Sequence, residues 1–316
     1  MYKISVFINN NLQDEKTFEL KNSNLRIKEV INTKINSHKL WSPDNPNVYD
    51  LNLKLFKPST HSKDTLNQIL DNYNEKFGFR EFTVKNNKFY LNDNPIYLKA
   101  AFFEGLYPVK LSFPDSKEMM IKEILMAKEA GFNMIRPWRK PPPKEWLHLA
   151  DSIGILTVGS MAIECMDMPI ESAYLPKRVE NEITESILRD RNHPSIVQWE
   201  LFNEIRRPVL ANMFTFNDLL SHTIDVQGFS HQNRDKLEAC HEKLPDKPIF
   251  LSECCSCNTM RDEDEGKETV YDNPHYADIQ KSFNARCTES NSSTNSSDGV
   301  EWGVGSYVWT LHDYFG

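Results

Sequence analysis

The stretch Ser195 to Glu204, S-I-V-Q-W-E-L-F-N-E, ends in an amide and a carboxylate that are placed well for polar chemistry. A short apolar, β-forming run comes directly before Asn203 and Glu204. This pattern is typical of a buried parallel strand whose C-terminal tip leaves the core. In (β/α)-barrel enzymes such tips carry the working residues. The alternative is that Asn203 and Glu204 begin the next helix, and this stretch alone does not decide between the two.

Strand-like and helix-like segments alternate over most of the chain and would position such a tip. The expected helices are 116–130, 143–153 and 178–190, and Gly131 and Gly154 stop the first two. The expected strands are 96–102, 132–136, 155–158, 196–202, 224–229, 248–252 and 305–311. Alternation with short connections predicts a parallel α/β sheet, and this many strands most often close as a (β/α)8-type TIM barrel.

One spacing does not fit a regular barrel. Each β/α unit of a typical barrel takes roughly 31 residues, so three strand steps need about 90. Glu253 stands only 49 positions after Glu204. We therefore expect an irregular barrel, in which the fifth strand and its helix are missing or collapsed into 206–221.

The N-terminal part of the chain reads differently, as antiparallel β-structure. Segments 1–8 and 49–56 alternate apolar and polar residues, and the turn-rich L-W-S-P-D-N-P-N-V-Y lies between them. We predict a partial immunoglobulin-like sandwich over 1–57, because a complete one takes about 100 residues. A polar linker over 58–76 and the barrel domain over 77–316 follow.

Composition limits the classes of partner. The chain has 316 residues, a formal charge of −8 and 39% hydrophobic residues. It carries no basic stripe of the kind that binds nucleic acid and no apolar run long enough to span a membrane. The N-terminus lacks the apolar core of a signal peptide, so the chain is expected to stay in the cytoplasm or to start within a longer protein.

The six cysteines do not form a regular disulfide framework. The cluster Cys254, Cys255 and Cys257 has no second cysteine or histidine group at ligand spacing, so ordinary thiols are favoured over a zinc site there. The sequons at Asn291 and Asn295 matter only in a secreted protein. They lie in the long connection 254–304, which is expected to be a disordered insertion rather than a lid.

Several stretches resemble glycoside hydrolase family 2, which holds β-galactosidases, β-glucuronidases and β-mannosidases. The most specific is R-D-R-N-H-P-S-I leading to N-E. The others are L-W-S-P-D-N-P-N-V-Y, G-F-R-E-F, Y-L-N-D-N-P-I-Y-L-K-A, G-F-N-M-I-R-P-W, K-P-I-F-L-S-E and G-S-Y-V-W-T-L-H-D-Y-F-G. The resemblance extends from about Leu40 to Gly316.

The resemblance implies a retaining glycosidase with Glu204 as acid/base and Glu253 as nucleophile. Retention needs one protonated carboxyl to donate to the leaving oxygen and one ionised carboxylate to attack the anomeric carbon, about 5–5.5 Å away. Glutamates at two strand tips across one barrel mouth can meet that geometry. Repulsion and burial would raise the pKa of the acid, while hydrogen bonds keep the nucleophile ionised. The plain alternative makes Glu253 a surface residue after a strand.

The resemblance also implies a set of substrate-binding residues. Asn203 matches the residue that hydrogen-bonds the sugar 2-hydroxyl, and Arg136 matches the arginine that holds the nucleophile charged. Trp309 matches the aromatic platform under the sugar, and Trp138 is expected to line the same mouth. A barrel-mouth ion pair and a core tryptophan are the structural alternatives for Arg136 and Trp309.

Departures from the family pattern affect the expected metal and the nucleophile's partner. Glu164 matches a glutamate that binds a divalent ion in some members, but Met166 stands where those members have histidine. His231 takes the place of a tyrosine that bonds the nucleophile, and its charge would titrate near neutrality. Phe102-Phe103-Glu104 replaces an Arg-His-Glu triplet, and Arg139 replaces a histidine. No cofactor is required, and a divalent cation at Glu164 stays open.

The sequence thus predicts a family 2 type β-glycosidase, closest to the β-galactosidase branch through the ending V-W-T-L-H-D-Y-F-G, acting on β-linked glycosides. The family's large N-terminal sugar-binding sandwich has no counterpart here. A rival hypothesis therefore makes the chain a truncated, inactive relative that binds carbohydrate or serves a structural role. The choice of sugar and homo-oligomerisation stay open.

Overall fold

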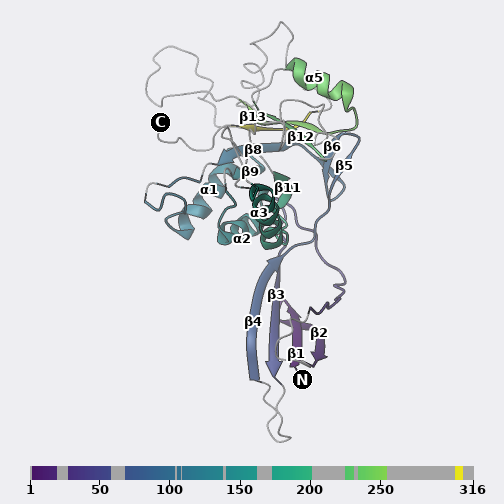
Figure 1. The fold of residues 1–316 in the computed structure, drawn as a ribbon, viewed down its shortest axis with the longest axis vertical. Helices are drawn as coiled ribbons and strands as arrows, with labels where there is room; N and C mark the ends of the chain where they lie inside the picture. Colours follow the sequence, from purple (N-terminus) through teal and green to yellow (C-terminus); the bar gives the residue numbers. More distant parts are fainter. Residues whose placement is uncertain are drawn as a thin grey trace, which may run out of the picture.

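The structure is a computed structural model of the chain. It describes residues 2–19, 28–57, 68–103, 105–107, 109–137, 140–161, 173–200, 225–230, 234–254 and 303–308. Within β12, α5, β13 and β14, only the side chains of 227–229, 237–243, 249–250 and 307 are described. Figure 1 shows a slender β-sheet at the N-terminal end and a larger part that holds the parallel sheet and the helices.

The N-terminal unit is a four-stranded antiparallel sheet in the order β2-β1-β3-β4. Its strands are β1 (Tyr2–Ile8), β2 (Asn11–Phe18), β3 (Tyr49–Lys57) and β4 (Gln68–Phe77). Asn9 and Asn10 have positive φ angles of 49° and 64° between β1 and β2, as a tight hairpin turn requires. The prediction of β-structure here is confirmed.

The predicted linker is wrong for part of its length, because residues 68–76 lie in β4. This strand pairs along its whole length with β3, from Tyr49 opposite Phe77 to Lys57 opposite Gln68. Its sequence, Q-I-L-D-N-Y-N-E-K-F, is polar, and most of its side chains are exposed. The backbone ladder, rather than apolar burial, therefore holds it in the sheet. The remainder of that range, 58–67, lies outside the described residues.

A small antiparallel sheet connects the two parts of the chain. It holds β5 (Phe82–Lys85), β6 (Lys88–Leu91) and β7 (Asn94–Ile96) in that order. Positive φ angles at Asn86, Asn87, Asn92 and Asp93 form the two turns. Asparagine and aspartate tolerate positive φ better than most residues, which suits them to these turns.

The larger part is built on seven parallel strands in the order β11-β10-β9-β8-β14-β13-β12. They are β8 (Leu98–Phe103), β9 (Met134–Pro137), β10 (Leu156–Ser160), β11 (Ile196–Glu200), β12 (Gln227–Ser230), β13 (Ile249–Cys254) and β14 (Gly303–Val308). This is the strand order of a TIM barrel in which β8 is the first strand and β14 the last. The predicted fold class is confirmed.

The barrel does not close over the described residues. Strands β11 and β12 each have one neighbour in the sheet and lie at its two ends. Between them in the sequence lie 201–224, outside the described residues, and this is the interval in which the residue count predicts the irregularity. The expected collapse of a unit into 206–221 therefore stays a prediction.

Helices follow most of the strands, as in β/α units. They are α1 (Lys117–Glu129), α2 (Lys144–Ile153), α3 (Leu175–Asp190) and α5 (Arg234–Lys243). Ser116 caps α1 by accepting from the Met119 amide, and Gly154 ends α2 with a φ of 84°. The first three helices were predicted. Helix α5 was not, because its sequence R-D-K-L-E-A-C-H-E-K offers few apolar positions.

Three buried clusters hold the described barrel part together; the smallest packs α5 against β12 and β13, and the two larger ones lie elsewhere. One packs α1 and α2 on the outside of the sheet, with Ile124, Trp146 and Leu147 fully buried or nearly so. The other contains Trp41 from the N-terminal part together with Leu98 and Met134, which are the first residues of β8 and β9. Trp41 therefore covers the N-terminal end of the barrel strands. Its indole nitrogen donates to the Asp151 carbonyl at 2.7 Å.

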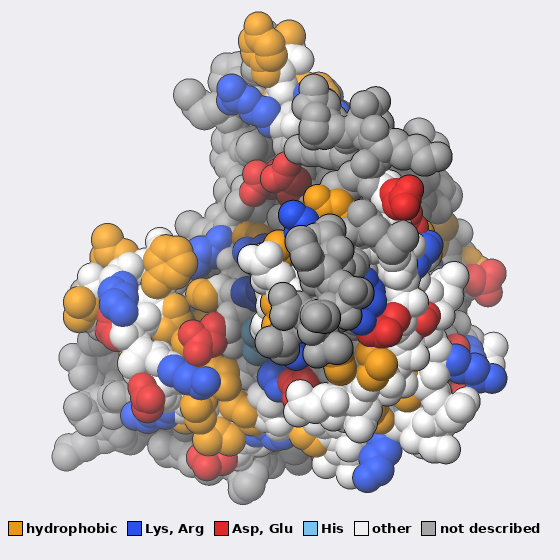
Figure 2. Space-filling view, turned by 90° about the horizontal axis from the view of Figure 1, so that it is seen from below, with side chains coloured by type: hydrophobic (Ala, Val, Ile, Leu, Met, Phe, Trp, Pro, Cys, Tyr) orange, Lys and Arg blue, Asp and Glu red, His pale blue; other side chains and the backbone are white. Residues whose placement is uncertain are grey.

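The surface carries mixed charge. Figure 2, seen from below, shows Lys and Arg side chains interspersed with Asp and Glu and with apolar groups, and no broad area of one sign. Among the helices that the structure describes, none combines the length and the apolar character needed to cross a bilayer.

Candidate active site at the C-terminal ends of the strands

The predicted site residues stand at one edge of the parallel sheet. Arg136 is next to last in β9, and Glu253 is next to last in β13, where its backbone is in register with Ser230 of β12. Because the C-terminal ends of parallel strands lie on the same side of the sheet, both residues belong to the face that bears TIM-barrel active sites.

The other predicted residues follow strand ends closely in the sequence but lie outside the described residues. Trp138 follows β9, Glu164 follows β10, and Trp309 follows β14; Asn203 and Glu204 follow β11, and His231 follows β12. The side chain of Glu253 is also outside the description. The structure therefore brings the strand ends together, while the roles of these side chains stay predictions.

Arg136 forms a buried ion pair with Glu200, the last residue of β11. Its Nε donates to one carboxylate oxygen at 2.7 Å, and its Nη2 pairs with the other oxygen. The Arg136 side chain is fully buried, and that of Glu200 is 18% exposed. The guanidinium carbon also lies 4.6 Å from the centre of the Phe102 ring. A two-point pair with an aromatic ring beside it fixes the plane of the guanidinium.

A second polar contact lies among the same strands. The Tyr307 hydroxyl on β14 donates to the side-chain oxygen of Gln198 on β11. Burial raises the pKa of Tyr307 well above its usual range, and the Glu200 carboxylate raises it further, while Arg136 acts in the opposite direction. Tyr307 therefore stays a neutral hydrogen-bond donor near neutral pH.

Sequence reasoning missed Glu200, although a signal for it was present. In a strand, residues two apart share a face, so Gln198 and Glu200 point to the same side of β11. When two polar residues stand two positions apart on a buried parallel strand, the face of the strand that they share is expected to contact other polar groups. The contacts of Gln198 with Tyr307 and of Glu200 with Arg136 identify that side as the interior of the barrel. Arg136 thus has a carboxylate partner that the sequence did not predict, and the predicted contact with Glu253 is untested.

Comparisons with known proteins agree with this architecture. The family model described as "Glycosyl hydrolases family 2, TIM barrel domain" matches residues 82–227, and the one described as "Glycosyl hydrolases family 2" matches residues 2–80. Together the two models cover well over half of the chain. The chain belongs to glycosyl hydrolase family 2. The junction between the two matches lies just after β4, where the antiparallel sheet ends.

Curated relatives within the family carry the name β-galactosidase. The chain is 30% identical over 172 residues to that of Lactococcus lactis subsp. lactis, which is 52% of this chain and 16% of the relative. It is 32% identical over 166 residues to that of Thermoanaerobacterium thermosulfurigenes, which is 51% of this chain and 21% of the relative. The match thus spans about a fifth or less of the length of these relatives.

Solved structures of family members share the fold. A β-glucuronidase of Bacteroides uniformis superposes with a TM-score of 0.75 at 19% identity, over 98% of this chain and 41% of that one. A β-galacturonidase of Eisenbergiella tayi superposes with a TM-score of 0.73 at 16% identity, over 98% of this chain and 58% of that one. At these identities the likeness concerns the fold alone.

Proposed function

We propose that this family 2 chain is a retaining β-glycosidase of β-galactosidase type, with Glu204 as acid/base and Glu253 as nucleophile. The observation that carries the proposal is the position of Glu253 at the C-terminal end of β13, on the sheet edge toward which β11 runs before Asn203 and Glu204. The names of the curated relatives support the choice of β-galactosides.

The mechanism needs two carboxyl groups in opposite protonation states. Glu204 protonates the leaving oxygen while Glu253 attacks the anomeric carbon and forms a glycosyl-enzyme. Water then attacks this intermediate, with Glu204 acting as base, and the sugar leaves with its configuration retained. In this proposal, Asn203 binds the 2-hydroxyl, Trp309 lies under the ring, and Trp138 and His231 line the mouth.

The Arg136–Glu200 pair has a defined place in this scheme. A guanidinium carries five N–H donors in a fixed plane, so one arginine can bind two carboxylates. Glu200 holds the plane from β11, and Arg136 then presents its charge at the end of β9, at the sheet edge where β13 places Glu253. A fixed positive charge near a carboxylate lowers its pKa, which is what a nucleophile requires.

The test is hydrolysis of nitrophenyl β-galactoside, β-glucuronide and β-mannoside by the intact chain. We expect the β-galactoside to be cleaved fastest, with cleavage abolished in Glu204→Gln and Glu253→Gln. Glu182→Gln, an exposed change on α3, is the matched control and should behave like the parent. A folded chain that binds the sugar but cleaves none of the three substrates would establish the rival, an inactive carbohydrate-binding relative.

A further inference from the structure

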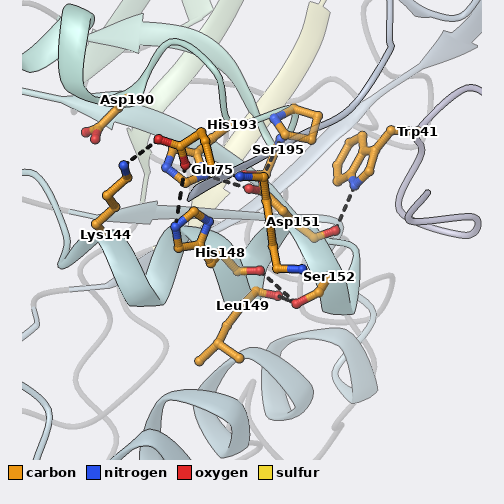
Figure 3. Close-up of polar contacts among 12 residues, drawn as sticks. Trp41, Glu75, Lys144, His148, Leu149, Asp151, Ser152, Asp190, His193 and Ser195 are labelled. Atoms are coloured by element: carbon orange, nitrogen blue, oxygen red, sulfur yellow. Dashed lines mark hydrogen bonds and ion pairs between the residues drawn. The ribbon is translucent and has the colours of Figure 1, made fainter. Parts of the chain in front are cut away.

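A separate cluster of potential metal ligands lies at the opposite end of the barrel strands. Glu75 comes from β4, His148 from α2, and His193 from the turn before β11. The side chains of Glu75 and His193 are 3% and 1% exposed, and that of His148 is 30% exposed. The cluster thus joins the antiparallel sheet to two elements of the barrel part (Figure 3).

The three side chains lie close enough to share one ion. One oxygen of Glu75 and one nitrogen of each histidine all lie within 4.8 Å of one another. The His148 Nε2 is 3.7 Å from Glu75 Oε1, and the two imidazole rings are 4.8 Å apart between centres. In Figure 3 both rings lie beside the Glu75 carboxylate.

His193 is oriented as a ligand would be. Its Nδ1 lies 2.6 Å from the buried Asp151 carboxylate, whose other oxygen accepts from the Ser195 amide at 3.1 Å. Donation from Nδ1 to a carboxylate leaves the lone pair on Nε2. Among the described residues, neither that buried Nε2 nor the buried Nδ1 of His148 has a hydrogen-bond partner. A buried acceptor without a partner is costly, and carboxylate–histidine pairs of this kind commonly stand behind metal ions.

Glu75 is held so that one oxygen faces the histidines. Its Oε2 accepts from Lys144 at 2.5 Å and from the Tyr73 hydroxyl at 2.7 Å. Oε1 is therefore the oxygen on the side of His148.

His148 is the ligand that solvent can reach, since its side chain is 30% exposed. Beside it, a groove of about 550 Å³ is lined by Glu75, His148 and Ser152, among others. This groove gives water and ions access to the cluster.

We propose that Glu75, His148 and His193 bind one zinc ion that joins the N-terminal sheet to the barrel. Two imidazole nitrogens and one carboxylate oxygen are a common zinc donor set, with water from the groove as fourth ligand. Ligands about 2 Å from zinc stand about 3.3 Å apart, and rotation of the half-buried His148 closes the remaining distance. The site is independent of the proposed glycosidase activity, since it lies at the other end of the strands.

The test is calorimetric titration of the metal-free, intact chain with zinc chloride. Thiols are first capped with N-ethylmaleimide, so that cysteines do not compete. We expect one zinc per chain and a rise in Tm on binding. His148→Ala should weaken binding at least about 100-fold, since it removes a direct ligand. His38→Ala, an exposed histidine elsewhere, should bind as the parent does.

Three outcomes would overturn the proposal. The first is that zinc does not bind saturably. The second is that a folded His148→Ala variant binds zinc as tightly as the parent. The third is that several zinc ions bind per chain and that His38→Ala and His148→Ala lose the same amount of zinc affinity. The last is the behaviour of surface imidazoles. Magnesium is a further control, because it prefers oxygen ligands and should leave the Tm unchanged.

Discussion

The two ends of the barrel strands use polar residues in different ways. At the N-terminal end, Asp151 accepts from His193 and from the Ser195 amide, and Trp41 donates to the Asp151 carbonyl. These contacts connect elements far apart in the sequence. At the C-terminal end, Arg136 and Glu200 hold each other at the strand tips that lead into the predicted catalytic residues.

The difference indicates that one end of the sheet serves stability and the other end serves activity. The contacts of Asp151 at the N-terminal end are buried and join the two parts of the chain, so they contribute to stability. The charges of Arg136 and Glu200 stand at the C-terminal ends of the strands, which is the usual location of activity in this fold. Substitutions at the N-terminal end should therefore change stability alone, whereas those at the C-terminal end should change turnover, and stability as well where they break the buried Arg136–Glu200 pair.

The largest expected effect is that of Glu253→Gln on turnover. Loss of a nucleophile should reduce kcat by about 10,000-fold or more, because no glycosyl-enzyme can form. The free energy of unfolding should change by less than about 1 kcal/mol, since glutamine has nearly the same size and shape as glutamate. Steady-state kinetics and urea unfolding measure the two. If the variant were unfolded enough to account for its loss of kcat, the separation of stability from turnover between the two ends would be contradicted.

Arg136→Met should affect both properties. It leaves the carboxylate of Glu200 without its buried partner, which costs about 3 kcal/mol in similar pairs. Urea unfolding of Arg136→Met, Glu200→Met and the double variant forms a double-mutant cycle. We expect the double variant to regain most of the lost stability but not the activity. Additive losses of stability would show that the two side chains do not act as a pair.

The two ends should also respond to pH in opposite directions. Beside the C-terminal end of β8, Tyr107 donates to the buried Glu123 on α1. Burial raises the pKa of Glu123 to about 7. The hydrogen bond from Tyr107 lowers this pKa, but by less than burial raises it. The stability that Glu123 contributes is therefore full below about pH 4.5 and is lost as pH rises through 7. Glu75 has a lowered pKa, so its contribution is lost as pH falls.

Glu123→Gln isolates this effect. Relative to the parent, the variant should gain about 2 kcal/mol in the free energy of unfolding between pH 5 and pH 8, because it cannot ionise. Urea unfolding at several pH values measures the gain. A difference that stays constant with pH would show that Glu123 titrates at its ordinary value in the folded chain.

The smallest expected effect is that of Trp41→Phe at the N-terminal end. It removes the hydrogen bond to the Asp151 carbonyl and part of a fully buried ring, which together cost about 1–2 kcal/mol. The kcat of the variant should equal that of the parent at temperatures where both are folded. A fall in kcat without a fall in Tm would place Trp41 in the catalytic machinery and would contradict the comparison.

The sequence predicted the elements that local interactions, such as helix capping, determine. Ser116, Gly131 and Gly154 mark helix ends through capping and left-handed geometry. It failed where pairing with a distant strand decides the structure, as in β4, whose exposed polar residues carry no strand pattern.

Side-chain partners were harder to predict than strand ends. Arg136 was identified as a site residue, but its pairing with Glu200 depends on how β9 and β11 are placed across β10; the spacing of polar residues in β11 indicates only the side that Glu200 faces. The histidine and glutamate cluster was missed for the same reason, since Glu75, His148 and His193 come from three separate elements.

The central claim is that Glu253 is the nucleophile of a retaining glycosidase, and covalent labelling tests it most directly. The chain is incubated with the 2-deoxy-2-fluoro analogue of whichever nitrophenyl glycoside it cleaves, and its peptides are analysed by mass spectrometry. We predict a slowly released fluorosugar on Glu253 and none in Glu253→Gln. A label on another carboxylate, or none on a chain that cleaves the parent substrate, would contradict the claim.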